Sequence, residues 1–208
     1  MLFTEVIKLK DGLFYNLEYH KVRVNKTCTA FGLPHIDLTQ IEDAVSNNCT
    51  KGLYKCRVLY SDKIDNIEIT PYTFRAIKTV ELIEDNSIEY SFKYACRDRF
   101  NALKAASCSD EIIIVKNGFI TDSSYTNLVF RQGNEYFTPK DPLLPGTKRE
   151  SLLDAGIIKA KSIKIEELFE YNTIHFINAM IDLEDNITCN ISSVKNNFTT
   201  TLGRVVQE

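Results

Sequence analysis

The stretch Ile120-Thr121-Asp122-Ser123-Ser124-Tyr125-Thr126-Asn127-Leu128-Val129-Phe130 places one carboxylate and a run of small polar and aromatic residues ahead of an apolar segment. The apolar residues at its ends are typical of strands, and the polar residues between them predict a loop. Such a loop could point into a cleft and offer the carboxylate of Asp122 to a ring nitrogen. Taken alone, a plain connection between two strands is the simpler interpretation.

Upstream of this stretch, Lys93 stands between an expected extended segment and a helix expected from Tyr94 to Ala106. Its neighbours Phe92 and Tyr94 are aromatic, and a charged lysine is costly to bury among such side chains. Burial therefore favours the neutral amine, which can form a Schiff base. For Lys93 alone, a lysine that extends its ammonium group to solvent is the simpler interpretation.

Two further segments could bind an anion. Pro145-Gly146-Thr147 predicts the start of a helix that runs to Ala155 and ends at Gly156. The free N–H groups and the dipole of such a helix start suit a phosphate. An ordinary capped helix would have the same pattern.

The other segment lies near the N-terminus. Leu17 to Phe31 predicts a helix with Asn16 as its N-cap, and on it His20 and Arg23 are three residues apart. They therefore share a face, where the arginine could bind a phosphate in a bidentate way. A surface arginine beside a buried histidine is the alternative.

The rest of the pattern predicts a mixture of helices and strands. A second helix is expected over Asp37 to Ser46, and Thr70 to Thr73 is the expected domain boundary. Strands are expected at residues 3–9, 13–15, 54–60, 66–69, 77–83, 111–115, 119–121, 127–130, 135–137 and 173–178, with possible edge strands at 190–194 and 198–202.

Composition excludes several classes of protein. The 208 residues carry a formal net charge of -3, which disfavours nucleic acid as the main partner. There is no apolar run long enough to span a membrane, and the N-terminal residues do not form a signal peptide pattern. The six cysteines include no C-x-x-C pair, so we expect reduced thiols, no metal site and a cytoplasmic protein.

In their order and spacing, these features resemble the class IV aminotransferases, the fold-type IV enzymes that use pyridoxal 5'-phosphate (PLP). Aminodeoxychorismate lyases, D-amino-acid aminotransferases and branched-chain aminotransferases are the most similar members, and the resemblance covers roughly residues 4 to 183. It implies that Lys93 forms the Schiff base at the start of a helix. It also implies that Arg23, in the family's H-x-x-R pattern, binds the cofactor phosphate, and that Asp122 binds the pyridine nitrogen.

The resemblance implies roles for further residues. Ser124 and Asn127 would lie beside the cofactor ring or behind its direct contacts. The family's G-I-T-R helix start matches Gly146 to Arg149, and the closing turn matches Asn178-Ala179-Met180. Met180 would offer its N–H to a substrate carboxylate. The residues expected to bind the cofactor, besides those already named, are Thr147, Lys148, Asn178 and Ala179.

The implied fold is α+β in two parts, a small N-terminal α/β domain (residues 1–72) and a larger, mostly β domain of the pseudo-barrel type (residues 73–208). The implied function is that of a PLP-dependent enzyme, in a homodimer, that acts on a small-molecule amino substrate. Either an aminotransferase or a 4-amino-4-deoxychorismate lyase fits. The turn at Asn178-Ala179-Met180 is nearest to the N-A-L of the lyases.

Three departures from the family keep other hypotheses open. The family's carboxylate is usually Glu where this chain has Asp122, its helix-start threonine is here Lys148, and an extra strand and loop usually precede the first segment. A truncated, non-catalytic relative that binds PLP or another small ligand without turnover is therefore the alternative. A third hypothesis is an α/β interaction domain in which Lys93 is structural.

Overall fold

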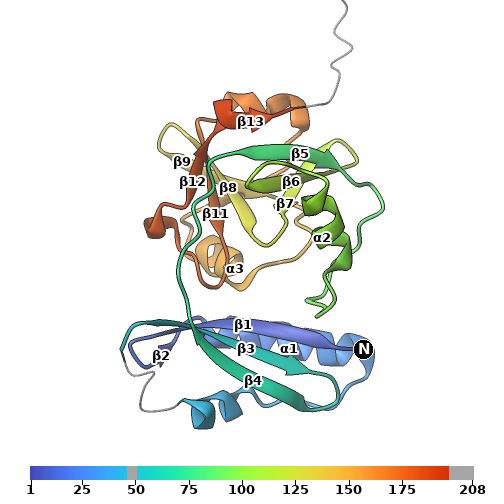
Figure 1. Ribbon diagram of the computed structural model, residues 1–208, viewed down its shortest axis with the longest axis vertical. Helices are drawn as coiled ribbons and strands as arrows, with labels where there is room; N and C mark the ends of the chain where they lie inside the picture. Colours follow the sequence, from blue (N-terminus) through green and yellow to red (C-terminus); the bar gives the residue numbers. More distant parts are fainter. Residues whose placement is uncertain (46–50, 197–208) are drawn as a thin grey trace, which may run out of the picture.

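The computed structural model describes residues 1–45 and 51–196, and its N-terminal part, residues 1–72, contains one antiparallel sheet (Figure 1). The helix α1 (Leu17–Phe31) and the 3-10 helix η1 (Leu38–Ala44) pack on one face of this sheet. In sheet order, the strands are β2 (Leu13–Phe14), β1 (Phe3–Lys10), β3 (Leu53–Tyr60) and β4 (Ile64–Pro71).

The N-terminal core is formed by every second residue of the strands, because alternate side chains point to the same face of the sheet. Phe3 and Ile7 on β1, like Val58 on β3, have no exposed surface and pack under α1. The helix α1 has the predicted bounds, and Gly32, in a left-handed conformation at φ 63°, ends it. Asn16 precedes α1 as predicted, but it is itself left-handed and its side chain makes no capping hydrogen bond.

The prediction of an α-helix over Asp37 to Ser46 is wrong, because the chain forms the 3-10 helix η1 instead. The side chain of Asp37 accepts a hydrogen bond from the N–H of Thr39 and starts the turn. Leu38 and Ile41, three residues apart, are both buried. A helix of three residues per turn places them on one face. Ser46 lies outside the described residues.

The C-terminal part contains two more sheets. The five-stranded sheet has, in order, β10 (Lys159–Lys161), β9 (Glu135–Pro139), β8 (Asn127–Gln132), β11 (Thr173–Ile177) and β12 (Thr188–Asn190). The four-stranded sheet has β13 (Val194–Lys195), β5 (Val80–Glu84), β6 (Glu111–Lys116) and β7 (Phe119–Ser123). The helices are α2 (Asp98–Ala105) and α3 (Thr147–Asp154), with the 3-10 helices η3 (Ile165–Glu170), η4 (Leu183–Asp185) and η5 (Ile191–Ser193).

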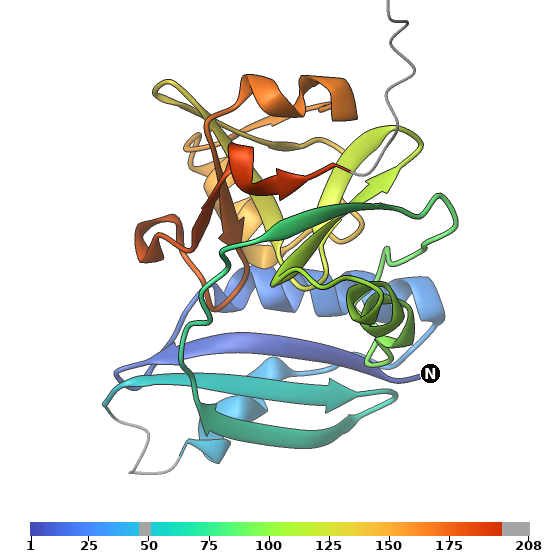
Figure 2. The same ribbon diagram turned by 45° about the horizontal axis from the view of Figure 1, so that its top comes forward.

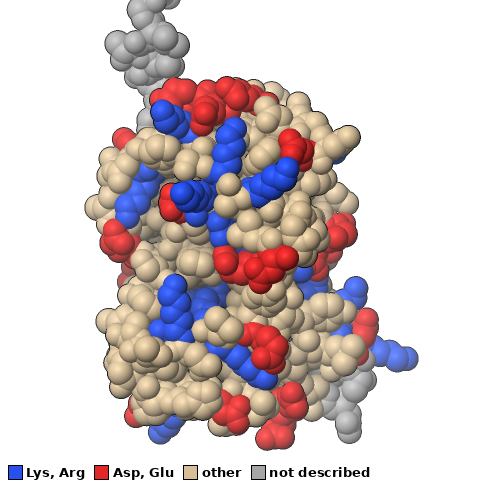
Figure 3. Space-filling model, turned by 180° about the vertical axis from the view of Figure 1, so that it is seen from behind, with Lys and Arg blue, Asp and Glu red and all other residues tan. Residues whose placement is uncertain are grey.

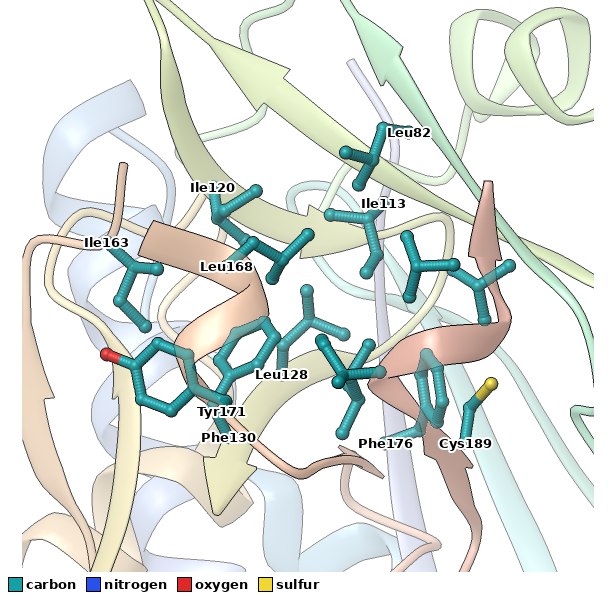
Figure 4. Packing of buried hydrophobic residues seen from close by; sticks show 14 of the residues in the cluster. Leu82, Ile113, Ile120, Leu128, Phe130, Ile163, Leu168, Tyr171, Phe176 and Cys189 are labelled. Carbon is teal, nitrogen blue, oxygen red and sulfur yellow. The ribbon is translucent and has the colours of Figure 1, made fainter. Parts of the chain in front are cut away.

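These two sheets enclose a single apolar core. Leu82 and Ile113 from one sheet point toward Leu128, Phe130 and Phe176 from the other, as the close view shows (Figure 4). The α+β organisation in a smaller and a larger, mostly β unit is therefore confirmed. The domain boundary at residue 72 stays a prediction, which the separation of the main cores supports.

Two other predicted elements differ from the structure, and a third lies outside the described residues. The strand predicted from Ile77 begins at Val80, because the N–H groups of Lys78 and Thr79 donate instead to the side chain of Asp110. The edge strand predicted over residues 190–194 is instead the end of β12, the turn η5 and the start of β13. The one predicted over residues 198–202 lies outside the described residues.

The helix predicted from Tyr94 begins only at Asp98, and Lys93 does not open it. The segment around Lys93 pairs with the beginning of β1 instead. Thr4 N–H donates to the carbonyl of Lys93 (3.0 Å), and Ala95 N–H donates to the carbonyl of Leu2 (2.9 Å). The ring of Tyr94 stacks on Phe3, with centroids 5.4 Å apart. These contacts hold the segment outside the helix and fix Lys93 to the N-terminal part.

The two parts meet along α1. In the tilted view, α1 runs along the boundary between the N-terminal sheet and the C-terminal part, where it contacts α3 (Figure 2). Within residues 1–45 and 51–196, no helix combines the length and the apolar character that crossing a bilayer requires.

Candidate active site

A pocket of about 370 Å³ lies where the two parts meet. Its volume is in the range of small-molecule sites. It brings together every predicted site residue except Lys148, namely Arg23, Lys93, Asp122, Ser124, Asn127, Thr147, Asn178, Ala179 and Met180. In the view from behind, Lys and Arg side chains gather around the waist between the two parts (Figure 3).

Lys93 is half-buried at the pocket wall. Its Nζ makes no hydrogen bond or ion pair with the residues that the structure describes. Loss of hydration and the neighbouring positive charge of Arg23 lower the pKa of its ammonium group to about 7. A large share of the side chain is therefore a neutral amine at neutral pH.

Asp122 lies near the end of β7 and is 5% exposed. Oδ1 accepts a hydrogen bond from the amide of Asn127 (2.7 Å), and Oδ2 accepts one from the N–H of Leu144 (3.0 Å). Burial raises the pKa of this carboxyl group to about 6, because these two neutral donors only partly compensate for the lost hydration.

Asn127 connects Asp122 to the start of α3. Its amide also donates to the carbonyl of Leu144 (2.9 Å). A Cβ atom on Gly146 would lie 1.9 Å from Asn127 Oδ1, so a side chain at that position would displace Asn127. The glycine thus allows the first turn of α3 to lie directly against the polar floor of the pocket.

Glu5, which sequence reasoning missed, pairs with both residues of the H-x-x-R pattern. Its Oε2 lies 2.6 Å from His20 Nδ1, and its two oxygens accept from Nε (2.8 Å) and Nη2 (2.5 Å) of Arg23. Burial opposes ionisation of Glu5, but the charges and hydrogen bonds of Arg23 and His20 together outweigh it and lower the pKa to about 2. The predicted bidentate contact of Arg23 is therefore made to Glu5. The signal in the sequence was a carboxylate on the buried face of an alternating strand.

The helix start at α3 differs from the family pattern in one side chain. Thr147 Oγ1 lies 3.3 Å from His20 Nε2, which joins α3 to the Glu5 cluster. Lys148 Nζ forms an ion pair with Asp182 and does not line the pocket. Arg149 is buried and donates to the carbonyl of Pro139 (2.8 Å), so it is a structural residue.

The closing turn is held by the side chain of Asn178. Its Oδ1 accepts hydrogen bonds from the N–H groups of Met180 (2.8 Å) and Ile181 (3.1 Å). The N–H of Met180 is thus used within the turn, and a substrate carboxylate would compete with Asn178 for it, so the predicted substrate contact of Met180 stays a prediction. The N–H of Ala179 has no acceptor among the described residues.

Three basic residues that sequence reasoning also missed line the pocket. Lys55 and Arg57 are alternate residues of β3 and so share one face of the strand. Arg97, on the other side of the pocket, donates to the carbonyl of Ser124 and lies 4.8 Å from the ring centroid of Phe100. None of the three makes an ion pair with the described residues.

Comparison with known proteins agrees with this geometry. The family model described as "Amino-transferase class IV" matches residues 2–183. An uncharacterized protein of Haemophilus influenzae is 34% identical over 184 residues, which cover 85% of this chain and 96% of that protein.

Solved structures show the same fold. A structure from Haemophilus somnus, described as a "putative 4-amino-4-deoxychorismate lyase", is 34% identical with a TM-score of 0.80, covering 86% of this chain and 96% of that one. A "hypothetical aminotransferase" from Mycobacterium tuberculosis in a PLP-bound form is 16% identical with a TM-score of 0.75. The match covers 93% of this chain and 81% of that one. The predicted resemblance is confirmed, and the chain belongs to the class IV aminotransferase family.

Proposed function

We propose that this protein is a PLP-dependent enzyme that acts on the amino group of a small anionic substrate. One observation carries the proposal. Lys93, whose Nζ has no partner within residues 1–45 and 51–196 and whose pKa is lowered to about 7, shares a pocket with the buried Asp122. A lysine of this kind can act as an amine nucleophile and as a proton carrier.

The residues of the pocket fit the cofactor. The first N–H groups of a helix have no partner within the helix, so those of Thr147 and Lys148 are suited to the phosphate. The free N–H of Ala179 and the guanidinium of Arg23 would add to this contact. Asp122 would face the pyridine nitrogen, where a protonated ring would oppose the rise in pKa that burial gives this carboxyl group.

When bound, PLP supplies an aldehyde that condenses with amines and a protonated ring that withdraws electrons from the substrate α-carbon. The chain's own groups supply the remaining chemistry. Lys93 Nζ would take the proton from the α-carbon and return it to a neighbouring atom, as general base and then general acid. The carboxylate of Asp122 would keep the ring nitrogen protonated. Asn127 would orient that carboxylate through its amide.

The charge of the pocket supports an anionic substrate. Lys55, Arg57 and Arg97 line it without a carboxylate partner among the described residues, and Asp122 is the one acidic residue in its lining there. Cations that line a pocket without carboxylate partners favour a carboxylate ligand. An amino acid and an aminated chorismate both carry one.

Two reactions share the proton transfer at the α-carbon. The turn Asn178-Ala179-Met180 and the likeness to the Haemophilus somnus structure support the lyase, which would release pyruvate without an amino acceptor. An aminotransferase would require a 2-oxo acid as the acceptor. A homodimer in the cytoplasm stays a prediction from the family resemblance.

The test is a visible absorbance titration of the purified protein with PLP, before and after borohydride. Wild type should gain a visible absorbance band, and borohydride should abolish this band while it fixes the cofactor covalently to the chain; Lys93→Ala should show neither effect. Lys63→Ala, which removes an exposed lysine between β3 and β4, is the matched control and should behave like wild type. Absence of the band in wild type with excess cofactor would refute the proposal.

Turnover is measured separately from binding. Pyruvate release from 4-amino-4-deoxychorismate, and amino transfer between amino acids and 2-oxo acids, distinguish the two reactions. A protein that binds PLP through Lys93 but turns over neither kind of substrate would be the non-catalytic relative.

A further inference from the structure

An ion cluster around Asp182 joins the two parts of the molecule behind the pocket. Its carboxylate accepts from Nζ of Lys8 at 2.6 Å and also pairs with Nζ of Lys148. The three side chains are 21%, 6% and 14% exposed, in the order Asp182, Lys8, Lys148. A second carboxylate, that of Asp185, lies 3.8 Å from Lys8 Nζ. The cluster is therefore largely shielded from solvent.

Each member of the cluster is next to a residue of the pocket wall. Lys8 follows Val6 by two positions on β1, so both side chains lie on the same face of that strand. Lys148 comes directly after Thr147 in the first turn of α3. Asp182 comes two residues after Met180, at the end of the closing turn.

We propose that Asp182 is a positioning residue that fixes the phosphate-binding end of the pocket by holding β1, the first turn of α3 and the turn 178–180 together. The proposal rests on the proposed function, because the phosphate concerned is that of the cofactor. Asp182 itself does not line the pocket, so its effect would be exerted through Lys8 and Lys148.

The physical reason is the charge that Asp182 balances. Burial opposes ionisation of Asp182, but Lys148 and Lys8 outweigh it and hold its pKa below the ordinary value. Without this carboxylate, two largely buried ammonium groups would face one another, with Asp185 close only to Lys8. Their repulsion and their lost partner would push α3 away from β1, and the N–H groups at the helix start would move with it.

A simple charge argument predicts the opposite result. Removal of one negative charge near the phosphate would make the site more positive and strengthen the binding of a phosphate dianion. The direction of change in Asp182→Asn therefore separates the positioning role from a purely electrostatic one.

The experiment compares the binding of PLP with that of pyridoxal, which has the same aldehyde and ring without the phosphate. Each is titrated by absorbance against wild type and Asp182→Asn. We expect the Kd of PLP to rise about tenfold in the variant, while the Kd of pyridoxal changes by less than about twofold. Glu135→Gln, which removes the carboxylate of an exposed pair with Lys159, is the matched control and should change neither value.

Three additional measurements distinguish a specific loss of PLP binding from a general loss of folding. Thermal unfolding without cofactor should show a cooperative transition for Asp182→Asn, and Asp182→Glu should regain most of the PLP affinity. In the cycle of Asp182→Asn with Lys148→Met, the double variant should bind PLP more tightly than Asp182→Asn alone, because removal of Lys148 also removes the repulsion between the two ammonium groups.

Tighter binding of PLP to Asp182→Asn, or an equal loss for PLP and pyridoxal, would overturn the positioning role and leave the proposed function intact. If wild type binds neither compound, the proposed function fails, and the role of Asp182 fails with it.

Discussion

Glu5 and Asp122 are both carboxylates within strands, one in each part of the molecule, and both are buried, at 0% and 5% exposure. The pKa of Glu5 is lowered to about 2, whereas the pKa of Asp122 is raised to about 6. The difference comes from the charge of their partners. Glu5 has the guanidinium of Arg23 and the ring of His20, whereas Asp122 has an amide and a backbone N–H.

The comparison teaches that burial alone does not determine the state of a carboxylate. Glu5 has a permanent cation within the protein, so it is a fixed structural anion. Asp122 has neutral hydrogen-bond donors but no close cation of its own, so its charge responds to whatever enters the pocket. The first residue organises the site, and the second is available for chemistry.

The largest expected effect comes from breaking the Glu5 cluster. Glu5→Gln leaves Arg23, which is 12% exposed, without its counter-charge, and should cost about 4 kcal/mol in the free energy of unfolding. Urea denaturation of the cofactor-free protein measures this. A loss below about 1 kcal/mol would contradict the view that Glu5 is a structural anion, because such a loss is typical of an exposed pair.

The matching change in the other region should affect activity and leave stability nearly as it is. Asp122→Asn preserves the size of the side chain and removes its charge, so we expect kcat/KM to fall about 100-fold. At pH 7 the free energy of unfolding should fall by only about 1 kcal/mol, because the Asn side chain can accept one of the two hydrogen bonds and no counter-charge is left unpaired. A variant that loses stability but retains activity would reverse the roles of the two carboxylates.

The two carboxylates should also give opposite dependences of stability on pH. The pKa of Glu5 is lowered on folding, so its contribution is complete above about pH 4.5 and is lost as the pH falls toward about 2. The pKa of Asp122 is raised from 3.8 to about 6, so the folded state gains stability as the pH falls through this window and loses it as the pH rises.

The window between pH 7 and pH 4 isolates the Asp122 effect. Wild type should gain about 2 kcal/mol relative to Asp122→Asn across it, by urea denaturation at each pH. Parallel curves for the two proteins would show that the pKa of Asp122 is not raised in the folded chain.

The smallest expected effect concerns the contact between the two regions. Thr147→Val keeps the shape of the side chain and removes the 3.3 Å contact with His20, so we expect a loss of about 1 kcal/mol or less in the free energy of unfolding. Lys93→Ala is the comparison variant, because it removes a side chain of the pocket and leaves the contact between Thr147 and His20 in place. A larger loss for Thr147→Val would mean that the Glu5 cluster depends on α3 for its geometry.

The sequence correctly predicted those elements that are determined by residues within them or directly beside them. Helix α1 has the predicted bounds, since its interior residues and the following Gly32 agree on one structure. The start of α3 was likewise predicted to the residue. Asp122 and Asn127 were each singled out within one polar stretch, and the structure joins them by a hydrogen bond that the sequence did not predict.

Contacts between distant segments were not predictable in the same way. The helix expected from Tyr94 fails because the backbone there pairs with residues 2–4, which no local pattern indicates. Glu5 was overlooked because its partners lie on a helix, beyond the turn that follows β1. The ion pair between the Lys148 side chain and Asp182 was likewise not foreseen, whereas the phosphate contact expected of the Lys148 backbone N–H stays a prediction. In each case, tertiary structure overrides local preference.

The backbone pairing of Lys93 with the start of β1 has a consequence for how the protein matures. Thr4 and Ala95 donate hydrogen bonds across this junction, so the segment that carries Lys93 is held in place only after the two ends of a long chain segment have met. Closing such a loop costs conformational entropy, and the hydrogen bonds of the junction offset this cost only once they have all formed. A newly made chain would therefore acquire a competent lysine late in folding, and capture of the cofactor would select molecules in which both parts have already docked.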